Sequence, residues 1–172
     1  MKPLICLVAF FSVFQVTLFG EDWSCFRGPN GQGRSDQTDF PVKWSEQQGI
    51  AWKTAIPGRG WSSPVVEGSE IWLTTATNAG HSLRAICVDA ETGSIRHNVE
   101  VFTPAHPVRL HPKNSHASPS PIVEHGRVYV HFGAMGTACL AAQTGKVLWR
   151  NNDLVIDHGV GPGRSAQTAG GM

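Results

Sequence analysis

The stretch Val88-Asp89-Ala90-Glu91-Thr92-Gly93 is followed 52 residues later by Leu140-Ala141-Ala142-Gln143-Thr144-Gly145, and this repeated pattern decides the fold. A second landmark, Ser63-Pro64-Val65-Val66-Glu67, recurs 57 residues later as Ser120-Pro121-Ile122-Val123-Glu124. The apolar runs between these landmarks are short and rich in valine and isoleucine, which favours strands over helices. A period of about 50 residues built from short strands is typical of a β-propeller or another repeat array.

Each copy of the repeat predicts one four-stranded antiparallel blade. Blade one is expected over 61–101, with strands at 61–67, 70–76, 82–88 and 94–100, and blade two over 118–150, with strands at 120–124, 127–133, 137–141 and 146–150. Ahead of blade one, Ile50-Ala51-Trp52-Lys53 matches Val147-Leu148-Trp149-Arg150, which predicts a lone outer strand that completes the last blade of a ring. The predicted fold class is all-β: an incomplete β-propeller of two four-stranded antiparallel blades plus an N-terminal closing strand.

Three further segments lie outside the two blades. We expect an N-terminal loop segment with the closing strand over 21–60, a long connecting loop over 102–117, and the start of a truncated third blade over 151–172. In the last of these, Ser165-Ala166 stands where Ser-Pro begins the earlier blades, and no apolar run follows it.

The first 20 residues predict a secretory signal peptide. Lys2 supplies the positive charge, and the apolar run from Leu4 to Phe19 has 16 residues, fewer than the roughly 20 that span a membrane. An uncleaved anchor is the alternative, because Leu18 is a poor match to the residue expected before a cut at Gly20. The sequence thus predicts an exported protein of the periplasm or cell envelope, with no membrane span once the signal is removed.

Composition argues against one class of partner, and the cysteine count indicates the state of the thiols. The net charge is +1 and 16% of residues are charged, which argues against a nucleic-acid partner. Signal removal leaves Cys25, Cys87 and Cys139, an odd number for an exported chain. Cys87 and Cys139 occupy equivalent repeat positions and are expected to be small buried hydrophobic residues, while Cys25 is expected to be a free thiol.

The long connecting loop carries the candidate pocket residues. Lys113, Asn114, Ser115 and His116 form a polar tetrad that is expected to face a ligand pocket at the propeller mouth, with a plain surface loop as the alternative. His106, His111 and His116 are five residues apart in a proline-broken loop, so their spacing predicts no zinc site. No catalytic residue is predicted, because Ser115-His116 lacks a strand-turn-helix elbow and an orienting acid.

The glycine run Gly28-Pro29-Asn30-Gly31-Gln32-Gly33 also predicts no nucleotide site, since no strand precedes it and no helix follows it. Trp23, Trp44 and Trp61 lie outside the repeat pattern. We expect these three side chains in the core, with ligand stacking as the alternative.

The repeat resembles the PQQ-like β-propeller repeat family. The stretches 88–93 and 141–149 match its Ala-x-Asp-x-x-Thr-Gly-Lys-x-x-Trp pattern, and the matching structural positions are Trp52, Asp89, Thr92, Gly93, Thr144, Gly145 and Trp149. Two positions depart from the pattern: Ala141 replaces the usual aspartate, and His97 replaces the usual tryptophan. The resemblance implies that Trp52 and Trp149 pack between blades and that His97 weakens one such contact.

The motifs at 23–33 and 113–119 are similar to those of a subgroup of exported bacterial propellers. The resemblance implies a non-enzymatic interaction scaffold, with a protein partner or self-association through open blade edges. The alternative is a fragment of a PQQ-dependent quinoprotein dehydrogenase, in which PQQ and Ca²⁺ lie at the propeller centre. No cofactor is predicted for this chain itself; PQQ and Ca²⁺ are expected only in a full-length parent.

Propellers of this type close with about seven or eight blades. The sequence therefore predicts the N-terminal fragment of a longer protein. We expect two isolated blades to be marginally stable or to aggregate, because each blade buries its faces against its neighbours.

Overall fold

The computed structural model describes residues 20–38, 40–153, 161–163 and 165. The predicted signal peptide, apart from Gly20, and most of the predicted third blade lie outside these residues. The described part contains eight strands and no α-helix, and its elements are β1 (Val65–Glu67), β2 (Glu70–Thr77), η1 (Asn78–Gly80), β3 (Ser82–Asp89), β4 (Ile95–Phe102), β5 (Ile122–Glu124), β6 (Arg127–His131), η2 (Gly133–Met135), β7 (Thr137–Ala141) and β8 (Val147–Asn151). No helix among these residues has the length and apolar character needed to cross a membrane.

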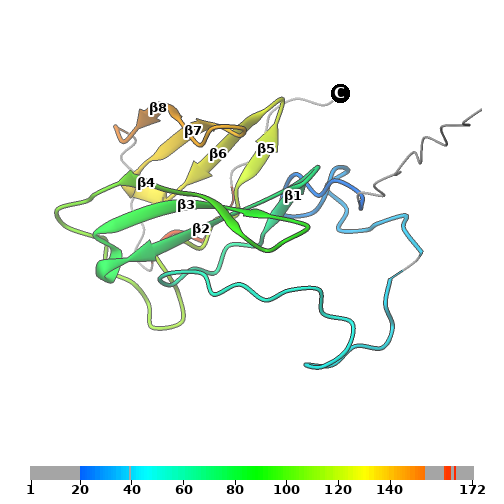
Figure 1. Cartoon of the computed structure of the whole chain (residues 1–172). Coiled ribbons are helices and arrows are strands. Elements are labelled where there is room, and N and C mark those ends of the chain that lie inside the picture. Colours follow the sequence, from blue (N-terminus) through cyan, green and yellow to red (C-terminus); the bar gives the residue numbers. More distant parts are fainter. Residues whose placement is uncertain (1–19, 39, 154–160, 164, 166–172) are drawn as a thin grey trace, which may run out of the picture.

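The strands form two four-stranded antiparallel sheets in chain order, β1-β2-β3-β4 and β5-β6-β7-β8, which lie side by side (Figure 1). This arrangement confirms the two predicted blades of an incomplete β-propeller, and all eight predicted blade strands are present. The first strand of blade one is shorter than predicted, because the residues ahead of Val65 bond elsewhere. Arg59 bridges to Ala76, and the amides of Trp61 and Ser62 both donate to the Ala117 carbonyl.

Matching positions of the two blades repeat the same backbone contacts. Trp72 in β2 pairs with Cys87 in β3, and Tyr129 in β6 pairs with Cys139 in β7. The turn before each outer strand is closed alike, by Gly93 N–H donating to Asp89 C=O and by Gly145 N–H donating to Ala141 C=O. The sequence repeat is therefore also a repeat of hydrogen-bond geometry.

One hydrophobic core runs through both blades. Its fully buried members include Val65, Trp72, Leu83, Val123, Val128, Val130, Phe132 and Leu140. Across the blade interface, the rings of Phe102 and Phe132 meet edge to face with centroids 6.1 Å apart. Each blade contributes one face to this core, so each depends on its neighbour for burial.

The cysteines lie as the sequence predicts. Cys87 and Cys139 are buried and Cys25 is half-buried, and all three are free thiols. Burial is the largest cause that raises the pKa of the Cys87 thiol, to about 12, so this group behaves as a small apolar side chain at neutral pH.

The predicted closing strand makes no β-ladder within the described part of the chain. Trp52 instead docks on blade one: its indole N–H donates to the Ala90 carbonyl at 2.9 Å, and its ring covers Gly93. Thr54 also hydrogen-bonds the Gly93 carbonyl. The segment thus contacts blade one, which follows it in the chain. As an outer strand it would instead pair with the third strand of a different blade.

Candidate binding cavity at the inner blade edges

The first strands of the two blades, β1 and β5, contact each other. The N-terminal segment completes this inner edge (Figure 1). Trp23 and Val66 exchange two backbone hydrogen bonds, and the Ser24 carbonyl accepts the Val123 amide at 2.9 Å. Residues 23 and 24 therefore connect the inner strands of both blades through backbone bonds alone.

Three serines extend this inner edge in a repeating pattern, which we call the serine relay: Ser63, Ser120 and Ser165. The Ser63 amide donates to Ser120 Oγ at 2.9 Å. The Ser120 amide in turn donates to Ser165 Oγ at 3.0 Å. Ser165 thus accepts from blade two the same hydrogen bond that Ser120 accepts from blade one. This bond is expected for the first residue of a further inner strand.

A cavity of about 1110 Å³ opens beside the serine relay. It draws its walls from the N-terminal loop, the start of blade one, the connecting loop and the start of blade two. The lining residues are Cys25, Phe26, Arg27, Gly28, Pro29, Gly31, Trp61, Lys113, Asn114, Ser118, Ser120, Ile122, Gly163 and Ser165. Two sequence motifs that lie far apart, at 23–33 and 113–119, therefore meet at one site.

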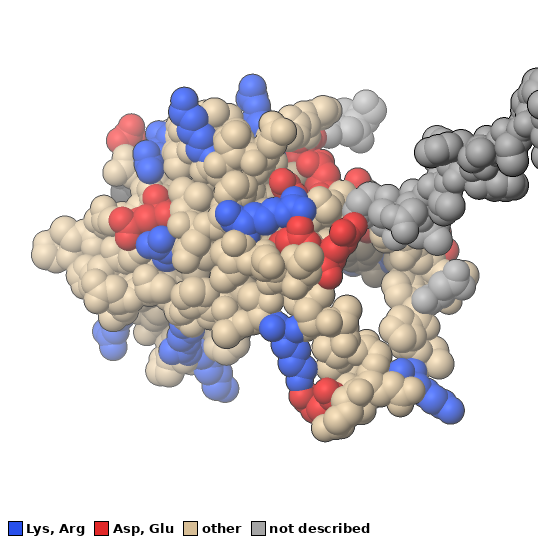
Figure 2. All heavy atoms as spheres, in the orientation of Figure 1, with Lys and Arg blue, Asp and Glu red and all other residues tan. Residues whose placement is uncertain are grey.

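The charge of this lining is one-sided. Arg27 and Lys113 are cationic, and no aspartate or glutamate is among the described lining residues. Acidic side chains gather instead toward the far end of β1 (Figure 2), where Asp22, Glu67 and Glu70 lie together. Burial, followed by the charges of Asp22 and Glu70, raises the pKa of Glu67. The described lining of the cavity is thus cationic, whereas the turn that follows β1 is acidic.

The four residues of the predicted tetrad, 113–116, do not all face the cavity. Lys113 and Asn114 line the cavity. Ser115 is buried behind it and bonds Ser118, while His116 lies elsewhere, with its Nε2 2.9 Å from the Val108 carbonyl and its ring against Gly80. His116 therefore fixes the connecting loop to the turn between β2 and β3.

Several lining residues were not predicted. Trp61 is 58% exposed and Trp44 is 70% exposed, so the expectation that both lie in the core is wrong. Trp23 is half-buried and covers Gly28. Phe26, Arg27 and Ser118 carry no chemical signature of their own, and only their membership of the two motifs could have indicated the site.

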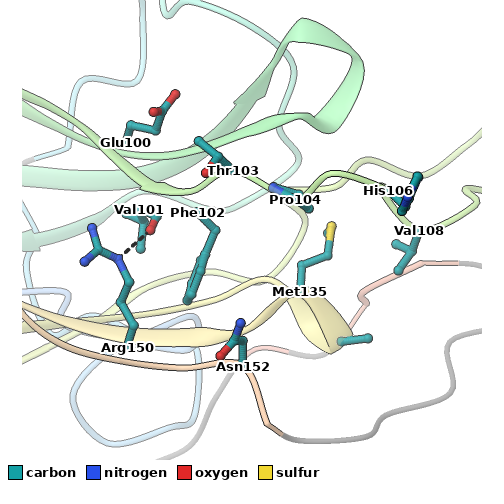
Figure 3. A pocket seen from close by; sticks show the side chains of 11 residues that line it. Glu100, Val101, Phe102, Thr103, Pro104, His106, Val108, Met135, Arg150 and Asn152 are labelled. Atoms are coloured by element: carbon teal, nitrogen blue, oxygen red, sulfur yellow. Dashed lines mark hydrogen bonds between the residues drawn. The ribbon is translucent and has the colours of Figure 1, made fainter.

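The other predicted histidines do not converge. His111 Nδ1 accepts the Lys113 amide within the loop, and His106 lines a second cavity of about 490 Å³ (Figure 3). In that cavity Arg150 donates to the Val101 carbonyl on one side, and His106 lies on the other side, beyond Met135. Among the described residues, no three His, Cys, Asp or Glu side chains lie close enough together to hold a metal ion.

The donor set of the large cavity does not fit calcium. Ca²⁺ takes several oxygen ligands, mostly from aspartate and glutamate, and the described lining offers hydroxyl and amide oxygens beside two cations. These described residues therefore do not form the calcium site that a quinoprotein centre requires.

Two adjoining antiparallel blades, each with a Thr-Gly turn before its outer strand, define a β-propeller repeat protein. The family model described as "Outer membrane protein assembly factor BamB" matches residues 36–153. The match covers more than half of the chain, so the chain belongs to this family of PQQ-like propeller repeats. This confirms the resemblance read from the sequence.

No curated protein matches the chain. Among solved structures, a "Europium-containing methanol dehydrogenase" is 18% identical with a TM-score of 0.41, over 60% of this chain and 18% of that one. The chain thus spans less than a fifth of that protein's length, and a likeness this distant carries no argument about activity.

Proposed function

We propose that this chain is part of an exported, non-enzymatic propeller that serves as an interaction scaffold and binds protein partners, or further copies of itself, through its open blade edge. The observation that carries the proposal is the environment of Trp149. Trp52 covers Gly93 of blade one, and His97 covers Gly145 of blade two. Trp149 holds the same repeat position on β8, yet its side chain is 43% exposed.

The surface around Trp149 has the character of an interface. The Tyr129 ring lies 6.3 Å from the Trp149 ring, and the next residue along the edge strand β8, Leu148, is 47% exposed on the opposite face. Exposed apolar side chains that gather on one edge mark association sites in soluble proteins. The fitting partner carries a glycine turn like those at Gly93 and Gly145, because such a turn lets an aromatic ring approach the backbone closely.

Ser165 supports the assignment of 151–172 to the start of a third blade. Its hydroxyl repeats the bond that Ser120 makes to blade one. Under this proposal the chain is a fragment of a larger ring, and its exported location follows from residues 1–20. N-terminal sequencing of the secreted product, with a new terminus after Gly20, tests the export.

Sedimentation velocity of the chain lacking residues 1–20 tests the open edge. We expect concentration-dependent association that Trp149→Ala weakens by about tenfold, the effect of losing one buried aromatic contact. Trp44→Ala is the matched control, because Trp44 is exposed outside the blades.

Two results would overturn the proposal. One, a monomer at every concentration or equal effects of the two variants, would contradict self-association through the open edge. The other concerns catalysis: oxidation of alcohols with an electron-accepting dye, after addition of PQQ and Ca²⁺, would contradict the non-enzymatic role.

A further inference from the structure

We infer that the cavity beside the serine relay binds an acidic oligosaccharide, a chain of sugar rings that carry carboxylate groups. Three properties of the described lining carry this inference: an aromatic platform, a pair of cations without an accompanying acid, and a wall of hydroxyl and amide groups. Each property matches one part of such a ligand.

The platform is Trp61. The Arg59 guanidinium lies 5.6 Å from the centre of its ring, which leaves a one-sided surface for a ligand. Trp61 is 58% exposed, and Phe26, on the motif at 23–33, is 57% exposed. Exposed aromatic side chains that gather in one cavity are typical of a ligand-binding site. The apolar face of a sugar ring packs well on one open ring face.

The cations are Arg27 and Lys113. They come from different motifs and meet at the same cavity. Arginine presents a planar fork that matches a carboxylate, while lysine presents a compact point charge. Because no described lining residue is acidic, these charges favour a ligand that bears carboxylates over a neutral one.

The wall holds Asn114, Ser118, Ser120 and Ser165. Ser118 Oγ donates to Asn114 Oδ1 at 2.5 Å, and the Ser115 amide donates to the same oxygen at 2.8 Å, so this wall is pre-organised. A ligand rich in hydroxyl groups suits donors and acceptors of this kind. The volume of about 1110 Å³ exceeds that of a usual small-molecule pocket, which favours several sugar units over one.

Isothermal titration of the chain lacking residues 1–20 with oligogalacturonate tests the inference. We expect binding that weakens with added salt. Trp61→Ala and Lys113→Gln should each reduce affinity by about tenfold, the loss expected for one platform or one charge-assisted hydrogen bond. The matched controls are Trp44→Ala and Lys43→Gln, which alter an exposed tryptophan and an exposed lysine of the N-terminal loop.

Each competing result contradicts the inference. Equal affinity for a neutral cello-oligosaccharide would remove the role of charge. Tighter binding of oligoglutamate or of PQQ would assign the cavity to an acidic peptide or to a planar cofactor, and absence of binding would leave it without a saccharide ligand. Trp149→Ala should not change the titration, so failure here is distinguishable from failure of the proposed self-association.

Discussion

Asp89 shows how one side chain organises a turn. Its Oδ1 accepts the amides of Glu91 and Thr92 and the Thr92 hydroxyl, and its Oδ2 pairs with Arg96. The hydrogen bond from the Thr92 backbone amide, followed by the hydrogen bond from the Arg96 side chain, lowers the pKa of Asp89 to about 2. Blade two folds the same turn with Ala141 in this place, so the aspartate stabilises the turn without being required for its shape.

A pH dependence follows from Asp89. The pKa of Asp89 is lower in the folded protein than in the unfolded chain. The stability that its ionised carboxylate contributes is therefore complete above the usual pKa of 3.8 and is lost as the pH falls toward about 2. Asp89→Asn should therefore lower the urea midpoint at pH 7, and the difference from wild type should shrink across that window. Glu91→Gln, on the exposed part of the same turn, is the control. A difference that stays constant with pH would contradict the role of the ionised carboxylate.

For single residues, the sequence predicted the chemical character of a side chain better than its surroundings in the folded protein. It identified Asp89, the buried cysteines and a polar loop at Lys113 and Asn114. It did not predict that His116 turns toward Val108 while Lys113 turns to the cavity, because that choice depends on contacts with residues far away in the chain. The exposure of Trp61 was missed for the same reason.

The turn between the third and fourth strands of each blade receives a ring from a neighbouring segment, Trp52 at Gly93 and His97 at Gly145. Gly93 has φ +72°, and a Cβ there would lie 2.5 Å from Trp52 Cδ2. Glycine thus serves two purposes: it adopts a left-handed conformation, and it lets an indole ring lie on the backbone.

Gly93→Ala separates these purposes when it is compared with Gly68→Ala. Gly68 has φ +56° and nothing within 4 Å of its Cβ position, so alanine there costs only backbone strain, about 1 kcal/mol. We expect Gly93→Ala to cost about 1–3 kcal/mol more, because Trp52 must also move. Urea denaturation measures both variants. If the costs are equal, Trp52 does not bind the turn tightly.

All eight strands follow from apolar runs and turn residues, and their edges shift by a few residues only. The short helix η1 was not predicted, because Ala79 has a left-handed conformation that alanine rarely adopts (φ 53°). The lack of a ladder at residues 50–53 could not be predicted either, since pairing depends on a neighbour that the local pattern does not reveal.

For the molecule as a whole, the interface between the two blades depends on His97, which takes the place of the usual tryptophan. Its Nε2 lies 3.2 Å from the Gln143 carbonyl, and its ring stacks on Trp72 with centroids 5.8 Å apart. The smaller ring therefore keeps the docking geometry while it buries less surface than an indole.

His97→Trp should strengthen the interface by about 1 kcal/mol, the value of an added aromatic contact. Thermal unfolding followed by circular dichroism measures the change, with Trp52→His as the reverse exchange at the other docking site, where a loss is expected. A lower midpoint for His97→Trp would mean that Trp72 leaves no room for the larger ring.

The serine relay has a consequence for how such a molecule changes over generations. The Ser120 and Ser165 hydroxyls each accept the amide of the serine that begins the blade before, so one genetic unit runs from one serine to the next and carries both the donor and the acceptor of its joints. Tandem duplication or loss of a whole unit preserves every pairing, whereas a partial insertion interrupts the series. Rings built this way should vary in size by whole blades, with each joint inherited intact.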